Sequence, residues 1–429
     1  MEENKIREQL LDHQKIVQAI PAPRNFTLMV LGQVVSIMGS VLLRFALSLF
    51  VLDQTGRADI FATLLAVSSI PLVLGPFGGA IADRFNRRNL MVIYDFTSSG
   101  ITITLFFLLW RGNNSILLIG LIMVLLSFIS AMYNPTVSAS IPLLVAEQKI
   151  EKANGIVSAV QALGSVLAPV LGSLLYGYLP IDRLILISGV AFFLSAVMEL
   201  FIHIPFEKGA MNGKLTKVIM NDLKEGFIYV RKEPFIYKSV LLAAALNMLV
   251  TPILIVAVPA ILRLVMHSSE LMYGLGNGLI GLAMVFGALT IGFFTKKLRF
   301  ANAYLWLLGL SALVLPIIVA VLPIVLSLGN SWSFLILMSG AIPISMLVSI
   351  LSIFLISKVQ RKTPNEQLGK VMAIIMAAAQ CSLPLGQLLY GKLLDTFETQ
   401  LYLPLFFVTG ILVFVSLGVK KGFKNIVED

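Results

Sequence analysis

The chain is dominated by a series of apolar runs, each long enough to cross a lipid bilayer as a helix. The hydrocarbon core of a bilayer is about 30 Å thick, and a helix needs about 20 apolar residues to cross it. Twelve such runs follow one another, at residues 26–52, 60–82, 89–110, 115–134, 154–179, 183–204, 238–262, 271–294, 301–327, 332–357, 368–394 and 401–419. None shows the period-two alternation of a membrane-spanning strand. The sequence therefore predicts an all-α membrane protein with twelve transmembrane helices.

The basic residues lie almost entirely on one side of this predicted topology. Only 13% of the residues are charged, against about 25% in soluble domains, and 26 of the 32 Lys and Arg residues fall in the two termini and in alternate loops. Basic loops mark the cytoplasmic side of a membrane protein. We therefore expect a bacterial cytoplasmic membrane protein with both termini in the cytoplasm. The same distribution argues against nucleic acid as a partner, although the net charge is +10.

A polar stretch at residues 205–237 divides the chain into two related halves. The segment GSLLYG at 172–177 recurs as GQLLYG at 386–391, and two further segments repeat at nearly the same offset of 213 or 214 residues. A constant offset indicates duplication, and parallel six-helix repeats are a transporter architecture that binds substrate between the halves. The expected domains are a cytoplasmic segment 1–25, the halves 26–204 and 238–419, the central loop 205–237 and a tail 420–429. Residues 218–230 are amphipathic, and we interpret them as a linker helix on the membrane surface.

The sharpest local motif lies between the second and third predicted helices. It reads Gly-x-x-x-Asp-Arg-x-Asn-Arg-Arg and consists of Gly79, Asp83, Arg84, Asn86, Arg87 and Arg88. Glycine allows a close approach of two helices, and a carboxylate is favoured near the N-terminus of a helix. A simple positively charged anchor would need the arginines but neither Gly79 nor Asp83. The motif therefore indicates more than charge asymmetry.

On these residues the chain resembles the major facilitator superfamily, with Asn86 where the family usually has glycine. The twelve helices, the central loop and the repeat extend the resemblance over the whole chain. The resemblance implies that the loop helps to latch the cytoplasmic side closed, with Asp83 meeting the start of the eleventh helix near Gly369. We assign Asp95, early in the third helix, to the same latch in preference to a proton relay.

A second motif lies in the fifth predicted helix. Gly155, Gly164, Pro169 and Gly172 are spaced along one span, and small residues at such spacing let helices pack closely. Ordinary packing accounts for the pattern, but it also resembles the antiporter motif of exporters in the family. The stretches GQVVS at 32–36 and NPTVS at 134–138 resemble the macrolide-efflux-like branch of drug exporters. The resemblance therefore implies export, with protons as candidate coupling ions.

Polar and ionisable residues inside the spans are the candidate substrate contacts. Gln33, Arg44, Gln161 and Asn247 are the residues that we select for a cavity between the halves. Arg44 either attracts an anionic group or pairs structurally. Glu199 lies so near the cytoplasmic end of its helix that an interfacial role is expected. The second half has no carboxylate at mid-membrane depth, so the residues support proton coupling only weakly.

Other classes of chemistry find no support in the sequence. There is no Gly-x-x-x-x-Gly-Lys-Ser/Thr loop for ATP, and three scattered histidines and one cysteine form no catalytic or metal site. We therefore expect no enzyme activity, no metal and no cofactor, and nothing requires more than a monomer. The predicted function is alternating-access export of small amphiphilic or lipophilic compounds across the lipid bilayer. The alternatives are export of a defined metabolite, such as a siderophore or a lysophospholipid, and a non-transporting membrane sensor or scaffold.

Overall fold

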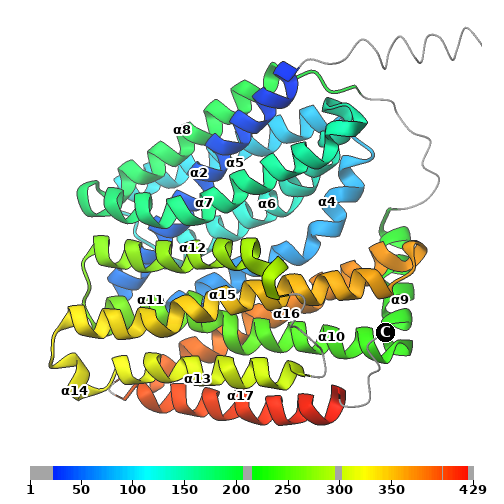
Figure 1. Ribbon diagram of the computed structural model, residues 1–429. Helices are drawn as coiled ribbons and strands as arrows, with labels where there is room; N and C mark the ends of the chain where they lie inside the picture. The colour runs from blue at the N-terminus through cyan, green and yellow to red at the C-terminus, as the bar shows by residue number, and fades with distance from the viewer. Residues whose placement is uncertain (1–22, 206–214, 295–301, 399, 424–429) are drawn as a thin grey trace, which may run out of the picture.

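The computed structural model describes residues 23–205, 215–294, 302–398 and 400–423, and every regular element in these ranges is helical (Figure 1). The N-terminal segment 1–22, the loop 295–301 and the tail 424–429, which carry basic residues used for the topology prediction, lie outside them. The described helices provide the twelve predicted spans, and the predicted fold class is therefore confirmed. We call the face at which the first span begins and the last span ends the inner face, and the opposite one the outer face.

The N-terminal half consists of six spans packed around their own apolar core. They are α2 (Pro23–Thr55), the broken span α3 (Ala58–Ser69), η1 (Ile70–Leu74) and α4 (Gly75–Ala82), then α5 (Arg87–Trp110), α6 (Ile116–Leu144), α7 (Ile150–Tyr178) and α8 (Ile181–Leu200). With 33 residues, α2 is about 50 Å long and extends beyond a bilayer core of about 30 Å. Large apolar side chains on the periphery, such as Leu117 at 85% exposure, face the lipid.

The second span is interrupted, for a reason that its sequence contains. Proline has no N–H to donate and disturbs the preceding helical turn. Prolines stand at the beginning of both η1 and α4, and the span narrows to a 3-10 turn between them. By contrast, α6 continues through Pro135 and Pro142 to Leu144, so the fourth span ends ten residues later than the predicted 115–134.

The C-terminal half repeats the arrangement with six further spans. The seventh span runs through α10 (Pro234–Ala245), three π-helical turns η3 (Leu246–Val250), η4 (Ile253–Ala257) and η5 (Ile261–Val265), and α11 (Val258–Ala260). The others are α12 (Glu270–Phe294), α13 (Ala303–Ala320), α15 (Asn330–Lys362), α16 (Asn365–Thr396) and α17 (Tyr402–Phe423), with the short α14 (Pro323–Leu326) in an outer loop. The π-helical turns accompany Pro252 and Pro259, whose missing N–H groups displace the ladder of hydrogen bonds.

The linker between the halves contains α9 (Leu215–Lys232), which includes the predicted amphipathic segment. It lies at the inner face beside the start of α16, at the right of Figure 1. Lys370 of α16 forms ion pairs with Glu225 and, at 3.7 Å, with Asp222 of α9. A Cβ atom at Gly226 would lie 2.8 Å from the carbonyl oxygen of Lys370, so glycine is needed for this close approach. The linker helix is thus docked on the C-terminal half.

Candidate functional site

The two halves meet along two pairs of helices. α7 packs against α12, and α3 packs against α16. Both contacts depend on glycines: a Cβ at Gly278 would lie 2.4 Å from Val170 Cγ2, and one at Gly391 would lie 2.3 Å from Ala62 Cβ. Gly278 lies nine residues into α12 from its outer end, and Gly391 lies five residues before the outer end of α16. The halves are therefore closely packed in the outer part of the molecule.

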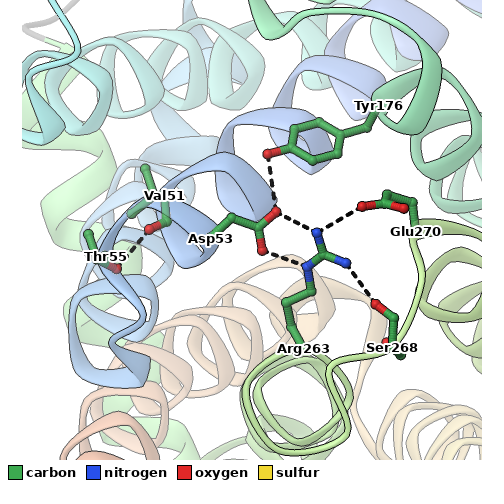
Figure 2. Close-up of polar contacts among 7 residues, drawn as sticks. All are labelled: Val51, Asp53, Thr55, Tyr176, Arg263, Ser268 and Glu270. Carbon is green, nitrogen blue, oxygen red and sulfur yellow. Dashed lines mark hydrogen bonds and ion pairs between the residues drawn. The ribbon is translucent and has the colours of Figure 1, made fainter.

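An ionic cluster joins the halves at the outer face (Figure 2). Arg263, near the end of the seventh span, donates from Nε to Asp53 Oδ1 at 2.5 Å and from Nη2 to Asp53 Oδ2 at 2.8 Å. The same guanidinium donates to Glu270 Oε1 at 3.0 Å and to the backbone oxygen of Ser268 at 2.8 Å. Tyr176 of α7 donates to Asp53 Oδ2 at 3.2 Å. We call Asp53, Tyr176, Arg263 and Glu270 the outer gate.

The geometry of the outer gate makes it a strong contact between the two halves. The planar guanidinium binds the carboxylate through two parallel hydrogen bonds, which is the strongest arrangement of this ion pair. The side chains of Arg263 and Asp53 are 16% and 24% exposed, so solvent screens them only in part. Phe45 and Tyr273 continue the contact between the halves with ring centroids 5.4 Å apart.

A second pair of charges across the halves is more exposed and weaker. Arg57 Nη2 lies 3.8 Å from Asp395 Oδ2 and bonds Asp59 at closer range. The hydrogen bond from Arg57 to Asp59 is the main reason that the pKa of the Arg57 guanidinium lies above its usual value. Exposed pairs of this kind contribute little to stability, because water and salt screen the two charges. The outer gate is therefore the stronger of the two connections.

None of the four outer-gate residues is among the site residues predicted from the sequence. Arg263 counts in the topology only as one of the few basic residues on the outer side, and Asp53 lies 210 positions before it. The feature of the sequence that could have identified them is that each lies at the outer end of a span, Asp53 in α2 and Arg263 in η5. A charge at that depth needs a partner, but only the fold identifies which one.

The predicted latch loop forms a compact network at the inner face. Arg87 donates to the backbone oxygens of Ala82 at 3.0 Å and Ala139 at 2.8 Å, and to Asp83 Oδ1 at 3.1 Å. Arg88 donates to the backbone oxygen of Leu200 at the end of α8. The loop thus ties α4, α5, α6 and α8 together.

Among the described residues, the carboxylate of Asp83 makes its hydrogen bond and ion pair with Arg87 of its own loop, and not with the eleventh helix. This carboxylate is 53% exposed, and a Cβ at Gly369 would find no atom of the described residues within 4 Å. Gly79 is also less crowded than expected. The close approach falls one residue earlier, at Gly78, where a Cβ would lie 2.8 Å from the carbonyl oxygen of Ala131. The latch role of the loop stays a prediction.

Asp95, which we expect in the latch, makes its hydrogen bond with another helix. Its side chain is 2% exposed and accepts a hydrogen bond from Ser36 of α2 at 3.0 Å. Glu199, expected at the interface, is completely buried and accepts from Tyr133 at 2.7 Å. Both carboxyl groups therefore belong to the interior of the N-terminal half.

The glycines of the fifth span receive side chains of the first. A Cβ at Gly164 would lie 2.5 Å from Ile37 Cγ2, and one at Gly172 would lie 2.7 Å from Phe45 Cδ1. Ile37 and Phe45 are eight residues apart on α2, and Gly164 and Gly172 are eight residues apart on α7. The two helices therefore run side by side in register. No atom of the described residues lies within 4 Å of the Cβ position of Gly155, and Pro169 lies between the packed glycines in a continuous helix.

The four predicted cavity residues have different surroundings. Gln33 is completely buried, Arg44 donates to Ser127 Oγ at 3.5 Å, and Asn247 donates to the backbone oxygen of Ala243 at 3.0 Å. Gln161 of α7 is exposed. Arg44 also lines a small pocket with the hydroxyl groups of Ser40, Ser127 and Ser130. In the part of the chain that the structure describes, no group of three or more His, Cys, Asp and Glu residues could hold a metal ion.

Comparison with known proteins agrees with this architecture. A sequence model described as Major Facilitator Superfamily matches residues 29–386. The chain is 22% identical over 372 residues to Macrolide efflux protein A of Streptococcus pyogenes, covering 85% of this chain and 88% of the relative.

Two solved structures share the fold over nearly the whole chain. A bacterial homologue of the iron transporter ferroportin in an inward-facing state superposes with a TM-score of 0.70 at 18% identity, covering 95% of this chain and all of the other. The nucleoside transporter NupG superposes with a TM-score of 0.71 at 15% identity, covering 94% of this chain and all of the other. At these identities the structures support the fold alone.

Proposed function

Since this chain belongs to the major facilitator superfamily, we propose that it exports small amphiphilic or lipophilic compounds, of the kind that macrolides represent, by alternating access. The carrying observation is the asymmetry of the contacts between the halves. The outer gate and the packed glycines lie in the outer part, whereas at the inner face Asp83 bonds within its own loop. Such a molecule is closed at the outer face and would receive cargo from the inner one.

Support for export comes from the fifth span and from the relatives. α7 packs against α2 through Gly164 and Gly172 and against α12 through Val170, so it connects the interior of its own half to the boundary between the halves. The similarity to a macrolide efflux protein supports the proposed branch of the family and the proposed class of cargo. We take the inner face to be cytoplasmic, as the basic loops predict, and proton exchange to be the energy source.

The test is transport by the purified full chain in proteoliposomes with an imposed pH gradient. Ethidium and erythromycin serve as amphiphilic probes, and protein-free vesicles provide the background. We expect gradient-dependent movement of at least one probe in the direction opposite to the protons. Absence of flux for both probes would contradict the proposed cargo class. The same assay tests the alternative of a sensor or scaffold, which would move no solute.

Arg44 favours a second candidate, export of a defined anionic metabolite such as a lysophospholipid or a siderophore. Its guanidinium lies inside a span, and within the described part of the chain it donates a hydrogen bond to the hydroxyl of Ser127. It also lines a pocket with two further serines. A cation in that setting suits an anionic group. If Arg44→Gln abolishes transport of an anionic lysophospholipid while Arg44→Lys retains it, this candidate is favoured. If neither substitution alters lysophospholipid transport, it is rejected.

A further inference from the structure

Two carboxyl groups lie deep in the N-terminal half, where the outer gate and the latch loop do not involve them. Asp95 of α5 is 2% exposed and Glu199 of α8 is 0% exposed. They lie close enough to interact electrostatically, and Tyr133 of α6 interacts with both. Ser36 and Gln33, one turn apart on α2, complete the group on its fourth side. We call these five residues the acidic cluster.

Hydrogen bonds satisfy only half of each carboxyl group. Ser36 Oγ donates to Asp95 Oδ1 at 3.0 Å, and the Tyr133 hydroxyl donates to Glu199 Oε1 at 2.7 Å. Ser195 of α8 faces Asp95, but no described residue lies within hydrogen-bond geometry of the buried oxygens Asp95 Oδ2 and Glu199 Oε2 or of either amide atom of Gln33. Buried polar atoms in native proteins are almost always paired. The cluster therefore has free acceptor positions for a small bound species.

No cation compensates these carboxyl groups within the described residues. The nearby basic side chain on α5 is Arg88, which donates to Asn89 and to the backbone of Leu200. On α2 the next basic side chain is Arg44, eight residues or about 12 Å beyond Ser36, and it bonds Ser127. From α6 and α8 the groups that face the carboxyls are Tyr133 and Ser195, which are uncharged near neutral pH.

An unpaired carboxylate inside a membrane protein is strongly unfavourable, and a second one beside it adds repulsion. Protonation removes this cost and converts a free acceptor oxygen into a hydroxyl group. We propose that Asp95 and Glu199 form the site that binds and releases the coupling proton, which adds to Asp95 Oδ2 or Glu199 Oε2. The assignment rests on the proposed function for its role in transport, but the binding of a proton does not.

The position of the cluster suits exchange with the inner face in this conformation. Glu199 is the residue before the last of α8, and Asp95 lies eight residues, or about 12 Å, into α5. The outer gate closes the opposite path. Ser36 precedes Ile37, the residue that packs against Gly164 of α7. A change of charge at Asp95 therefore acts on a part of α2 that is held between α8 and α7.

The direct test uses infrared difference spectroscopy on the purified full chain, comparing acidic with alkaline buffer. We expect the carbonyl band of a protonated carboxyl group in the wild type, and its loss in the variant Asp95→Asn/Glu199→Gln. Asp182→Asn, which removes an acid at the outer end of α8, is the matched control and should retain the band. A wild type without the band, or a double variant that keeps all of it, would overturn the proposal.

Thermal stability gives an independent readout. A carboxyl that stays protonated in the folded state binds more protons than in the unfolded state, so stability should fall as pH rises through neutrality. The double variant should lack this part of the slope, and Asp182→Asn should keep it. If sodium or calcium ions at fixed pH stabilise the wild type but not the double variant, the cluster is a metal site and the proton assignment is wrong.

Transport separates this proposal from the proposed function. In proteoliposomes the single variants Asp95→Asn and Glu199→Gln should retain downhill ethidium flux and lose the response to a pH gradient by at least tenfold. If the wild type moves neither ethidium nor erythromycin, the cargo class fails while the infrared result still decides the proton site. If both single variants still respond to the gradient as the wild type does, the coupling role of the cluster is refuted.

Discussion

The guanidinium of Arg263 donates two hydrogen bonds to the carboxylate of Asp53, although the two residues are 210 positions apart in the sequence and lie in different halves. This contact ties the outer end of the first span to the outer end of the seventh. It is therefore the natural place to alter the balance between outward-open and inward-open states.

Asp53→Asn should favour opening of the outer face. The substitution removes the charge from a partly buried, bidentate pair, and a hydrogen bond to a charged group is worth about 1.5–3 kcal/mol. We expect the population of the outward-open state to rise about tenfold or more. Spin labels at positions 113 and 328, on the outer loops of the two halves, measure this change through the distance between their unpaired electrons. The labels are attached in a Cys381→Ser background, so that the native cysteine is not labelled.

The control for this variant is Asp182→Asn, which removes an acid from the outer face outside the gate. It should leave the distance distribution unchanged. An unchanged distribution in Asp53→Asn itself would show that the gate does not set the conformational balance.

Gly391→Ala should act on the same balance through packing. Its Cβ would lie 2.3 Å from Ala62 Cβ and 3.2 Å from the carbonyl oxygen of Ala58, across the boundary between the halves. The clash is relieved when the halves separate at the outer face, so we expect longer distances between the labelled outer loops. Gly410→Ala in α17, where a Cβ meets nothing within 4 Å, is the control. Equal behaviour of the two variants would contradict the packing argument.

Gly164→Ala should destabilise the protein by about 1–3 kcal/mol, the usual range for overpacking. The added Cβ would lie 2.5 Å from Cγ2 of Ile37, a branched side chain that cannot rotate away freely. The midpoint of thermal unfolding in detergent measures the effect. Adding Ile37→Ala should recover part of the loss, and Gly155→Ala on the same helix should be neutral or slightly stabilising. A destabilised Gly155→Ala would point to a general intolerance of the helix.

Asp83→Asn should impair transport while leaving folded protein in the membrane. In this conformation its exposed carboxylate bonds Arg87, and the latch prediction requires it to bond the other half when the inner face closes. A loss of about 1.4 kcal/mol in the closed state would lower ethidium efflux about tenfold. The efflux rates of this variant and of the control Asp182→Asn are divided by the amount of each protein in the membrane. Full efflux by Asp83→Asn would refute the latch role.

The helices were predictable from the sequence because lipid requires each span to satisfy its own backbone hydrogen bonds. Run length and composition therefore located all twelve spans. The exceptions concern prolines: Pro135 and Pro142 do not end α6, whereas prolines at η1 and α4 interrupt the second span. Whether neighbouring helices compensate the lost hydrogen bond decides between these outcomes, and a single span does not contain that information.

The polar contacts were less predictable, since depth along a helix does not specify direction around it. Asp95 is near enough to Arg87 in sequence to suggest a common latch, yet its side chain points to Ser36 on α2. Glu199 lies close to the end of α8 and is nevertheless fully buried against Tyr133. The spacing of the glycines is more informative about helix packing, because Gly164 and Gly172 receive side chains of the neighbouring helix. Pairing between the halves, as in Asp53 and Arg263, needs the assembled fold.

The outer gate has a further consequence for the speed of the cycle. When the halves separate, Asp53 keeps Tyr176 of its own half, and Arg263 keeps Glu270 and the backbone oxygen of Ser268. Neither charge is left without a hydrogen-bond partner at the moment of rupture. The free-energy barrier to opening therefore does not include the cost of a charge with no hydrogen-bond partner. This contact can keep the resting state closed at the outer face and still break and re-form in every transport cycle.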